Sequence, residues 1–229
     1  MSEIEMVLPS VYLLYVKLSK ENKKCLRSYS GKLVEELESR LARLEDTPNA
    51  VQRGEGRWQI DFKDLLSLRR EESRARHCPL VSENMDEAKG CLEAIHYLLG
   101  EFRNALKQLR VKDSEEMFYY AYCIYARPNS PAQEMHKDLG FKWGKGYFTA
   151  LLALSNEAEN TEFLHEGRVV PVPGFICFDG HVIHRGPAVG DKARIVLALV
   201  ASPKPDENSI SSNSPFMNCA KDWGIIVIK

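Results

Sequence analysis

The chain has 229 residues, with 31 basic and 32 acidic side chains and a formal net charge of −1. This length suits one large domain with a sizeable core, and the balanced charge disfavours a protein that chiefly binds nucleic acid. No stretch approaches the ~20 apolar residues that span a bilayer, and we expect no signal peptide. The six cysteines form no CxxC pair, so we expect free thiols in an intracellular, cytoplasmic protein, with a nuclear location left open.

The first half of the chain has a helical hydrophobic period. Leucines follow one stripe of a predicted helix within 30–46, and a longer predicted helix within 82–110 repeats apolar residues three and four apart. One such stripe suits docking on a sheet better than a coiled coil. We therefore expect residues 1–112 to form a helical N-terminal region that packs on the rest of the chain.

The second half, residues 113–229, has β character. Its apolar runs are rich in aromatic and β-branched residues, and glycine and proline interrupt them every few positions. The predicted strands lie within 117–126, 146–156, 161–187, 192–202 and 222–229. Short strands with frequent turns predict a sandwich or barrel, which we expect to form one integrated domain with the helical region.

A candidate metal site begins in the sequence QEMHKD, where one residue separates His136 from Asp138. Side chains two apart on a strand face the same way, so an imidazole nitrogen and a carboxylate oxygen can reach one metal ion. A surface pair without function would have the same pattern. The third ligand could be His165, His181 or His184. Two histidines and one carboxylate form the facial triad of non-haem Fe(II) oxygenases, which leaves the opposite coordination positions open.

Residues 118–201 resemble the catalytic core of the Fe(II)/2-oxoglutarate-dependent oxygenases, and the prolyl-hydroxylase-like branch in particular. His184 follows His136 by 48 residues, and Arg194 comes ten residues after His184. The segments ENTEF, PVPG and FDGHVIHRG stand in the order in which that family has its strand entry, its turn and its distal histidine strand.

The resemblance implies an α+β fold, namely a double-stranded β-helix (jelly-roll) core with the N-terminal helices packed on the larger sheet. It also implies that His136, Asp138 and His184 hold Fe(II).

The resemblance further implies a site for the co-substrate 2-oxoglutarate, whose distal carboxylate would pair with Arg194. A buried carboxylate requires such a charge-assisted partner. The alternative is an arginine at the mouth of a strand, paired with Asp191 or with solvent. Tyr125 and Thr149 match positions from which relatives contact the co-substrate, although Tyr125 could equally be an aromatic residue of the core.

The two histidines of FDGHVIHRGP cannot both bind one metal, because residues three apart on a strand face opposite sides. His184 has the arginine ten residues on. His181 follows Asp179-Gly180, a turn pair, and we expect it at the outer entrance of the strand.

We therefore expect a 2-oxoglutarate-dependent dioxygenase, a hydroxylase that uses O2. It would hydroxylate a C–H bond of a protein side chain or a small metabolite, with release of succinate and CO2. The alternatives are a cupin-like metal oxygenase without 2-oxoglutarate, a nucleic-acid-modifying oxygenase and a non-catalytic jelly-roll binding module. The chain departs from the family in lacking the second glycine of the strand entry, and Ala153 stands where many prolyl hydroxylases have a second tyrosine. No second arginine follows Arg194, which counts against base demethylation.

Overall fold

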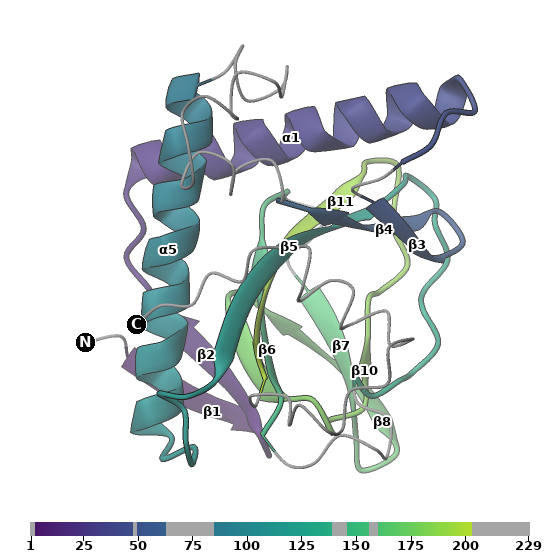
Figure 1. Ribbon diagram of the computed structural model, residues 1–229. Coiled ribbons are helices and arrows are strands. Elements are labelled where there is room, and N and C mark those ends of the chain that lie inside the picture. The colour runs from purple at the N-terminus through teal and green to yellow at the C-terminus, as the bar shows by residue number, and fades with distance from the viewer. Residues whose placement is uncertain (1–2, 48–49, 63–84, 139–145, 156–159, 203–229) are drawn as a thin grey trace, which may run out of the picture.

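Two antiparallel sheets and two long helices form the part of the chain that the computed structural model describes, residues 3–47, 50–62, 85–138, 146–155 and 160–202 (Figure 1). The helices are α1 (Lys20–Ala42) and α5 (Met85–Gln108). The strands are β1 (Glu3–Leu8), β2 (Val11–Tyr15), β3 (Ala50–Gly54), β4 (Arg57–Asp61), β5 (Phe118–Ala126), β6 (Phe148–Ala153), β7 (Asn160–His165), β8 (Arg168–Pro173), β9 (Ile176–Asp179), β10 (His184–Arg185) and β11 (Arg194–Ser202).

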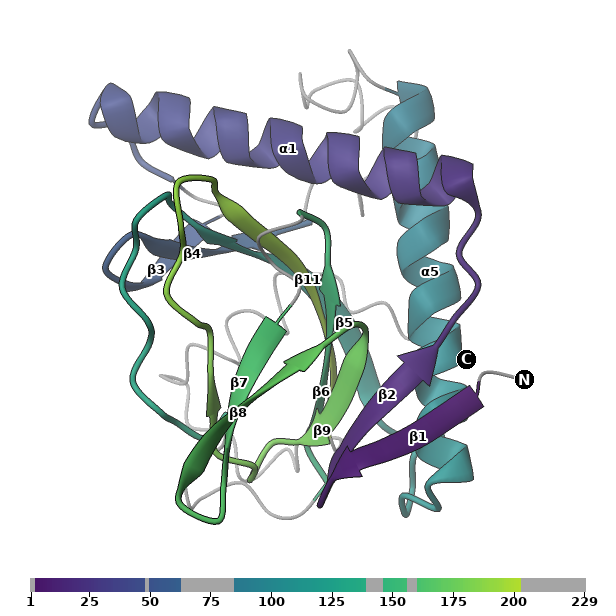
Figure 2. The same cartoon turned by 180° about the vertical axis from the view of Figure 1, so that it is seen from behind.

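The large sheet has eight strands in the order β1-β2-β9-β6-β11-β5-β4-β3, and the small sheet has the order β10-β7-β8. In the large sheet β11 pairs along its whole length with β5, from Arg194 opposite Ala126 to Ser202 opposite Phe118. Figures 1 and 2 show the small sheet on one side of β5 and β6 and helix α5 on the other. This arrangement is a double-stranded β-helix with helices on its larger sheet, as predicted.

Alternation along each central strand divides the large sheet into two faces, because successive side chains point to opposite sides. Tyr119, Cys123 and Leu199 belong to the core that lies under the helices. Val196 and Ala198 belong instead to the core between the two sheets. We call the face that lines the space between the two sheets the inner face, because a site enclosed by both sheets can form only there.

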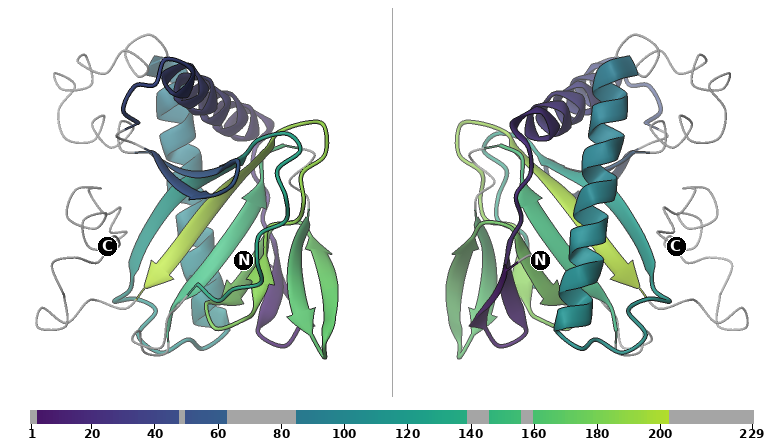
Figure 3. Two further views of the ribbon diagram at one scale, coloured as in Figure 1. Left: turned by 90° about the vertical axis from the view of Figure 1, so that its right-hand side faces the viewer. Right: turned by 90° about the vertical axis from the view of Figure 1, so that its left-hand side faces the viewer.

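The predicted helix within 82–110 lies on the sheet as expected. Its apolar stripe is buried against β5 and β11, and the ring of Phe102 meets Tyr119 edge to face at a centroid distance of 6.0 Å. Figure 3 shows α5 running along the outer face of the sheet, with α1 crossing above β3 and β4. None of the described helices is long and apolar enough to cross a membrane.

Residues 1–112 differ from the expected helical region, because they also contain β1, β2, β3 and β4 at the two ends of the large sheet. Each of these strands is short, and its partner strand supplies the hydrogen bonds that fix it, as where Trp58 lies opposite Tyr125. The pairings of β2 with β9 and of β4 with β5 join segments distant in sequence and leave no trace in local periodicity. Leu44, on the predicted helical stripe, is 95% exposed beyond the end of α1 at Ala42. The strand predicted within 222–229 falls outside the described residues.

The cysteines of the described residues, Cys25, Cys91, Cys123 and Cys177, are free and buried, as predicted. Cys25 and Cys91 lie on the two helices, and Cys123 and Cys177 lie on the sheet in the core under the helices. Burial raises the pKa of each thiol.

An ion pair fastens α1 to the sheet. Arg127 comes directly after β5. Its guanidinium donates through Nε to Glu38 Oε1 at 2.7 Å and lies 4.7 Å from the ring centroid of Trp58. The hydrogen bonds from Arg127 outweigh burial and hold the pKa of Glu38 below its ordinary value.

We predict that Glu38→Gln lowers the free energy of unfolding at pH 7 by about 0.5–1 kcal/mol, the range for a partly exposed ion pair. Because the pKa of Glu38 is depressed in the folded state, its contribution is present above the ordinary value of 4.5 and is lost as the pH falls below it. Denaturant titrations at pH 7 and at acid pH measure both effects. Glu35→Gln, at an exposed position of the same helix, is the control; equal losses in the two variants would contradict the assignment.

Candidate metal centre

Backbone pairing brings His136 and His184 together. Each of them donates its backbone N–H to the carbonyl of the other at 2.9 Å, an isolated antiparallel bridge that extends the small sheet beyond β10. Two residues on, the backbone N–H of Asp138 donates to Gly180 at 3.1 Å. One ligand atom from each of the three side chains lies within 4.8 Å of the others, so that they could hold a metal ion.

Hydrogen bonds fix the tautomer of both imidazoles. His136 Nδ1 lies 2.9 Å from the Glu134 carbonyl and His184 Nδ1 lies 3.0 Å from the Val182 carbonyl. A carbonyl only accepts, so Nδ1 carries the proton in each ring and the lone pair is on Nε2. The Nε2 atoms of His136 and His184 lie 3.9 and 3.4 Å from Asp138 Oδ1, so the lone pairs are available on the side where a metal would sit.

The carboxylate is held from its other side by Thr149, whose Oγ1 donates to Asp138 Oδ2 at 2.6 Å. Burial alone would raise the pKa of Asp138, but the neighbouring His184 imidazole and the hydrogen bond from Thr149 outweigh burial and hold the pKa below its ordinary value. Asp138 is therefore a carboxylate at neutral pH with Oδ1 directed toward the histidines. The hydroxyl of Thr149 thus positions this carboxylate, and its predicted contact with the co-substrate stays a prediction.

The surroundings of the centre differ from one side to the other. The ring of Phe178 lies 4.5 Å from that of His184, and the ring of Phe163 lies 6.1 Å from it. The side chain of His184 is 7% exposed, whereas that of His136 is 40% exposed. The centre therefore has an apolar wall behind His184 and is open to solvent beside His136. Two imidazoles and one carboxylate with open positions suit a non-haem Fe(II).

Tyr125 does not face this centre, contrary to the prediction. It lies in the core under the helices, and its ring stacks on Trp58 at a centroid distance of 5.8 Å. The reason is strand alternation, since Tyr125 precedes Ala126, the residue opposite Arg194. Tyr120 is on the inner face, and its hydroxyl lies 3.3 Å from that of Tyr147. The family pattern therefore assigned Tyr125 to the wrong face of the sheet.

Arg194 lies on the inner face and is 3% exposed. Its Nη2 donates to the carbonyl of Asn160 at 3.1 Å, while Nε has no partner. Asp191, the alternative partner, forms no ion pair with it in the described part of the chain. Burial, together with the nearby charge of Arg57, lowers the pKa of Arg194 to about 10.

Arg57 was not singled out from the sequence. It begins β4 and is 2% exposed, on the same face as Arg194. A signal for Arg57 was present in the sequence, because it begins "RWQIDF", in which apolar residues alternate as in a half-buried strand. An arginine buried in such a strand requires an anionic partner, which makes it a candidate binding residue.

The other histidine candidates lie apart from the cluster. His181 occupies a turn, and its ring Nδ1 pairs with Asp179 Oδ1 at 2.8 Å. His165 ends β7 and lies beside Glu166. The position of His181 outside the strand agrees with the expectation that it is not a ligand.

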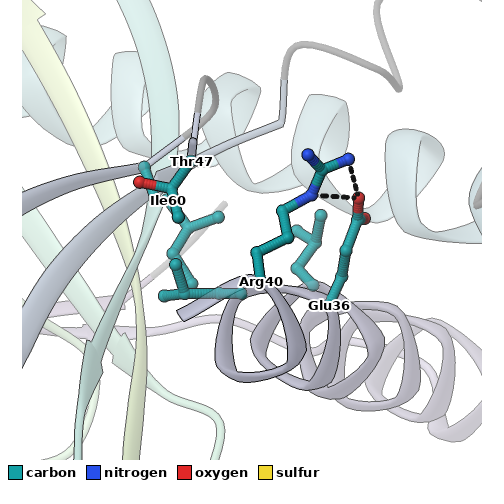
Figure 4. Close-up of a pocket in the computed structure, with 7 residues that line it drawn as sticks. Glu36, Arg40, Thr47 and Ile60 are labelled. Carbon is teal, nitrogen blue, oxygen red and sulfur yellow. Dashed lines mark hydrogen bonds and ion pairs between the residues drawn. The ribbon is translucent and has the colours of Figure 1, made fainter. Parts of the chain in front are cut away.

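A separate hollow lies between α1 and the β3–β4 hairpin (Figure 4). Leu33, Leu37, Ala50 and Ile60 contribute most of its apolar lining. Its two charged side chains satisfy each other, because Arg40 donates to Glu36 at 3.0 and 3.1 Å. Ile60 belongs to the core under the helices, so the hollow is on the opposite face of the sheet from the metal centre and shares no group with it.

The solved structures that the chain resembles are oxygenases and related proteins. A dioxygenase for auxin oxidation from rice is 17% identical, with a TM-score of 0.54 over 86% of this chain and 76% of that one. A prolyl hydroxylase from Trichoplax adhaerens, in complex with a peptide of the hypoxia-inducible factor oxygen degradation domain, is 14% identical, with a TM-score of 0.49 over 86% and 84%. AviO1 from Streptomyces viridochromogenes Tue57 is 13% identical, with a TM-score of 0.49 over 82% and 86%.

No protein-family model matches the sequence, and no curated protein matches it. The likeness to the rice dioxygenase shows that the chain shares the fold of that protein. The resemblance predicted from the motifs is confirmed at the level of the fold.

We predict that Thr149→Val weakens binding of Fe(II) or Co(II) by about 10- to 100-fold, the usual effect of losing a hydrogen bond that orients a ligand. Anaerobic calorimetry measures the affinity. Thr149→Ser should restore it, because serine keeps the donor. Thr161→Val makes the same change at another buried threonine, on β7, and should bind metal like the wild type. Unchanged affinity in Thr149→Val would show that the hydroxyl does not support the site.

Proposed function

We propose that the chain is an Fe(II)- and 2-oxoglutarate-dependent oxygenase that hydroxylates a C–H bond. The proposal rests on one observation: a set of three metal ligands and a buried guanidinium lie close together on the inner face. The Nε2 atoms of His136 and His184 and Oδ1 of Asp138 form a three-ligand set. The buried guanidinium of Arg194 lies beside Gly186, two residues beyond His184. One small molecule with a chelating end and an anionic end satisfies both.

Iron in such a site supplies the activation of O2, so that one oxygen atom enters the substrate C–H bond and the other enters succinate as 2-oxoglutarate loses CO2. The chain supplies the geometry. Thr149 holds Asp138, and the carbonyls of Glu134 and Val182 hold the two rings. Arg194 binds the distal carboxylate by charge-assisted hydrogen bonds.

The proposed substrate is a protein side chain or a small metabolite. It approaches on the side of His136, because His184 has phenylalanine rings behind it and only the first histidine is substantially exposed. The formal net charge of −1 does not favour a polyanionic substrate.

We predict that His184→Ala abolishes formation of the Fe(II)–2-oxoglutarate chelate and that His181→Ala leaves it intact. Without oxygen, Fe(II) chelated by a 2-oxo acid has a visible charge-transfer absorption, which can be titrated without knowledge of the substrate. The two variants remove the same ring three residues apart. Loss of the absorption in His181→Ala with retention in His184→Ala would reverse the assignment of ligands.

We also predict that the protein forms succinate from 2-oxoglutarate when Fe(II), O2 and candidate substrates are present, and that Arg194→Gln forms far less. Mass spectrometry of succinate and of the substrate measures the coupling. Oxidised substrate with no succinate would identify a metal oxygenase that uses no 2-oxoglutarate. A wild-type protein that binds no metal would identify a binding module.

A further inference from the structure

A second buried arginine stands beside Arg194. Arg57 of β4 and Arg194 of β11 both lie opposite Ala126, the last residue of the strand between them. Residues in one register row of a sheet project from the same face. The two guanidinium groups therefore extend side by side on the inner face, and the small side chain of Ala126 leaves room between them.

The opposite side of this space is closed by Gly186, just after β10. A side-chain carbon at Gly186 would lie 2.9 Å from Arg57 Nη1, which is too close, and 3.5 Å from Arg194 Nη1, which is an ordinary contact, so any residue larger than glycine would displace the Arg57 guanidinium. It would also lie 2.7 Å from Gln133 Oε1, which accepts the backbone N–H of Gly186 at 2.9 Å. The absence of a side chain at Gly186 thus lets both guanidinium groups come close to its backbone.

The charge of this arginine pair is not balanced within the described part of the chain. Arg57 donates to the carbonyls of Pro131 and Pro187 at 2.7 and 2.6 Å, and Arg194 to that of Asn160. Carbonyls are dipoles and do not neutralise two full charges, and each arginine keeps a buried nitrogen with no hydrogen-bond partner, Nη1 of Arg57 and Nε of Arg194. Neither arginine can accept from the other. Two buried cations with free donors are stable only beside an anion.

We infer that Arg57 and Arg194 together bind one carboxylate of the co-substrate, so that Arg57 is a second determinant of selectivity for a 2-oxo dicarboxylate. The inference rests on the proposed function, because the other end of the same molecule chelates the metal. A single arginine gives a carboxylate one donor fork, whereas two forks can satisfy both oxygens from two sides. A 2-oxo acid with an uncharged tail leaves both guanidinium groups buried and unpaired, so the pair penalises it doubly.

The test measures the affinity of Fe(II)-loaded protein, without oxygen, for 2-oxoglutarate and for 2-oxopentanoate, which has the same carbon chain but no distal carboxylate. In Arg57→Gln we expect the affinity for 2-oxoglutarate to fall by about 10- to 100-fold, the effect of losing a charge-assisted hydrogen bond. The affinity for 2-oxopentanoate should not fall, because the variant removes one of the two charges that this ligand leaves unpaired. Arg57→Lys should be intermediate, because it keeps the charge without the planar fork.

Two further variants make the test specific. Arg43→Gln removes the same charge from an exposed pair with Glu45 beyond the end of α1, and it should change neither affinity. Gly186→Ala keeps every charge but displaces the Arg57 guanidinium, and it should lower the affinity for 2-oxoglutarate alone. If Arg57→Gln does not fold, the affinities of Gly186→Ala test the inference in its place.

The outcomes separate the inference from the proposed function. If wild-type protein binds 2-oxoglutarate and the ratio of the two affinities is unchanged in Arg57→Gln and in Gly186→Ala, Arg57 merely braces the proline carbonyls and the inference is wrong. A parallel loss for both ligands leads to the same conclusion. If the wild type binds metal but no 2-oxoglutarate, the proposed function fails and the inference fails with it.

Discussion

The pairing of β11 between β5 and β6 is the constraint on which the rest of the structure depends. β11 is buried on both sides, so its alternation assigns one set of side chains to the helices and the other to the space between the sheets. The registers with β5 and β6 then determine which residues of those strands face inward. Thr149 faces Asp138 because of the register with β6, and Arg57 lies near Arg194 because both β4 and β11 pair with β5 opposite Ala126; a slip of one residue would exchange the two faces.

The parts of the fold that could be predicted from the sequence are those with a strong local pattern. The amphipathic stripe of α5 and the apolar runs of β5 and β11 are long enough to determine both their type and their burial. The choice of His184 over His181 needed only the turn pair before His181 and the arginine ten residues after His184. Such patterns predict the structure because every buried side chain in the element shows the same preference for the apolar face.

The rest depended on contacts between residues distant in sequence. β2 and β4 join the large sheet by pairing with β9 and β5, which are distant in sequence, and segments as short as "VYLLY" or "RWQID" do not reveal these partners. Tyr125 was misplaced because matching a family pattern fixes a position only to within a residue, whereas strand parity changes with every residue. Arg57 was missed for another reason: its partner Arg194 is 137 positions away, and like charges give no pairing signal in a sequence.

Buried thiols acquire a meaning from the proposed chemistry. Cys123 and Cys177 belong to the core under the helices, on strands whose other face lines the space between the sheets. Burial raises the pKa of the Cys123 thiol to about 12, and that of Cys177 is raised further above its ordinary range, so both remain protonated and are poor nucleophiles. Under the proposed function the large sheet would therefore also act as a shield. It places these two thiols on the face opposite the metal centre, one layer away from the oxygen that would react there.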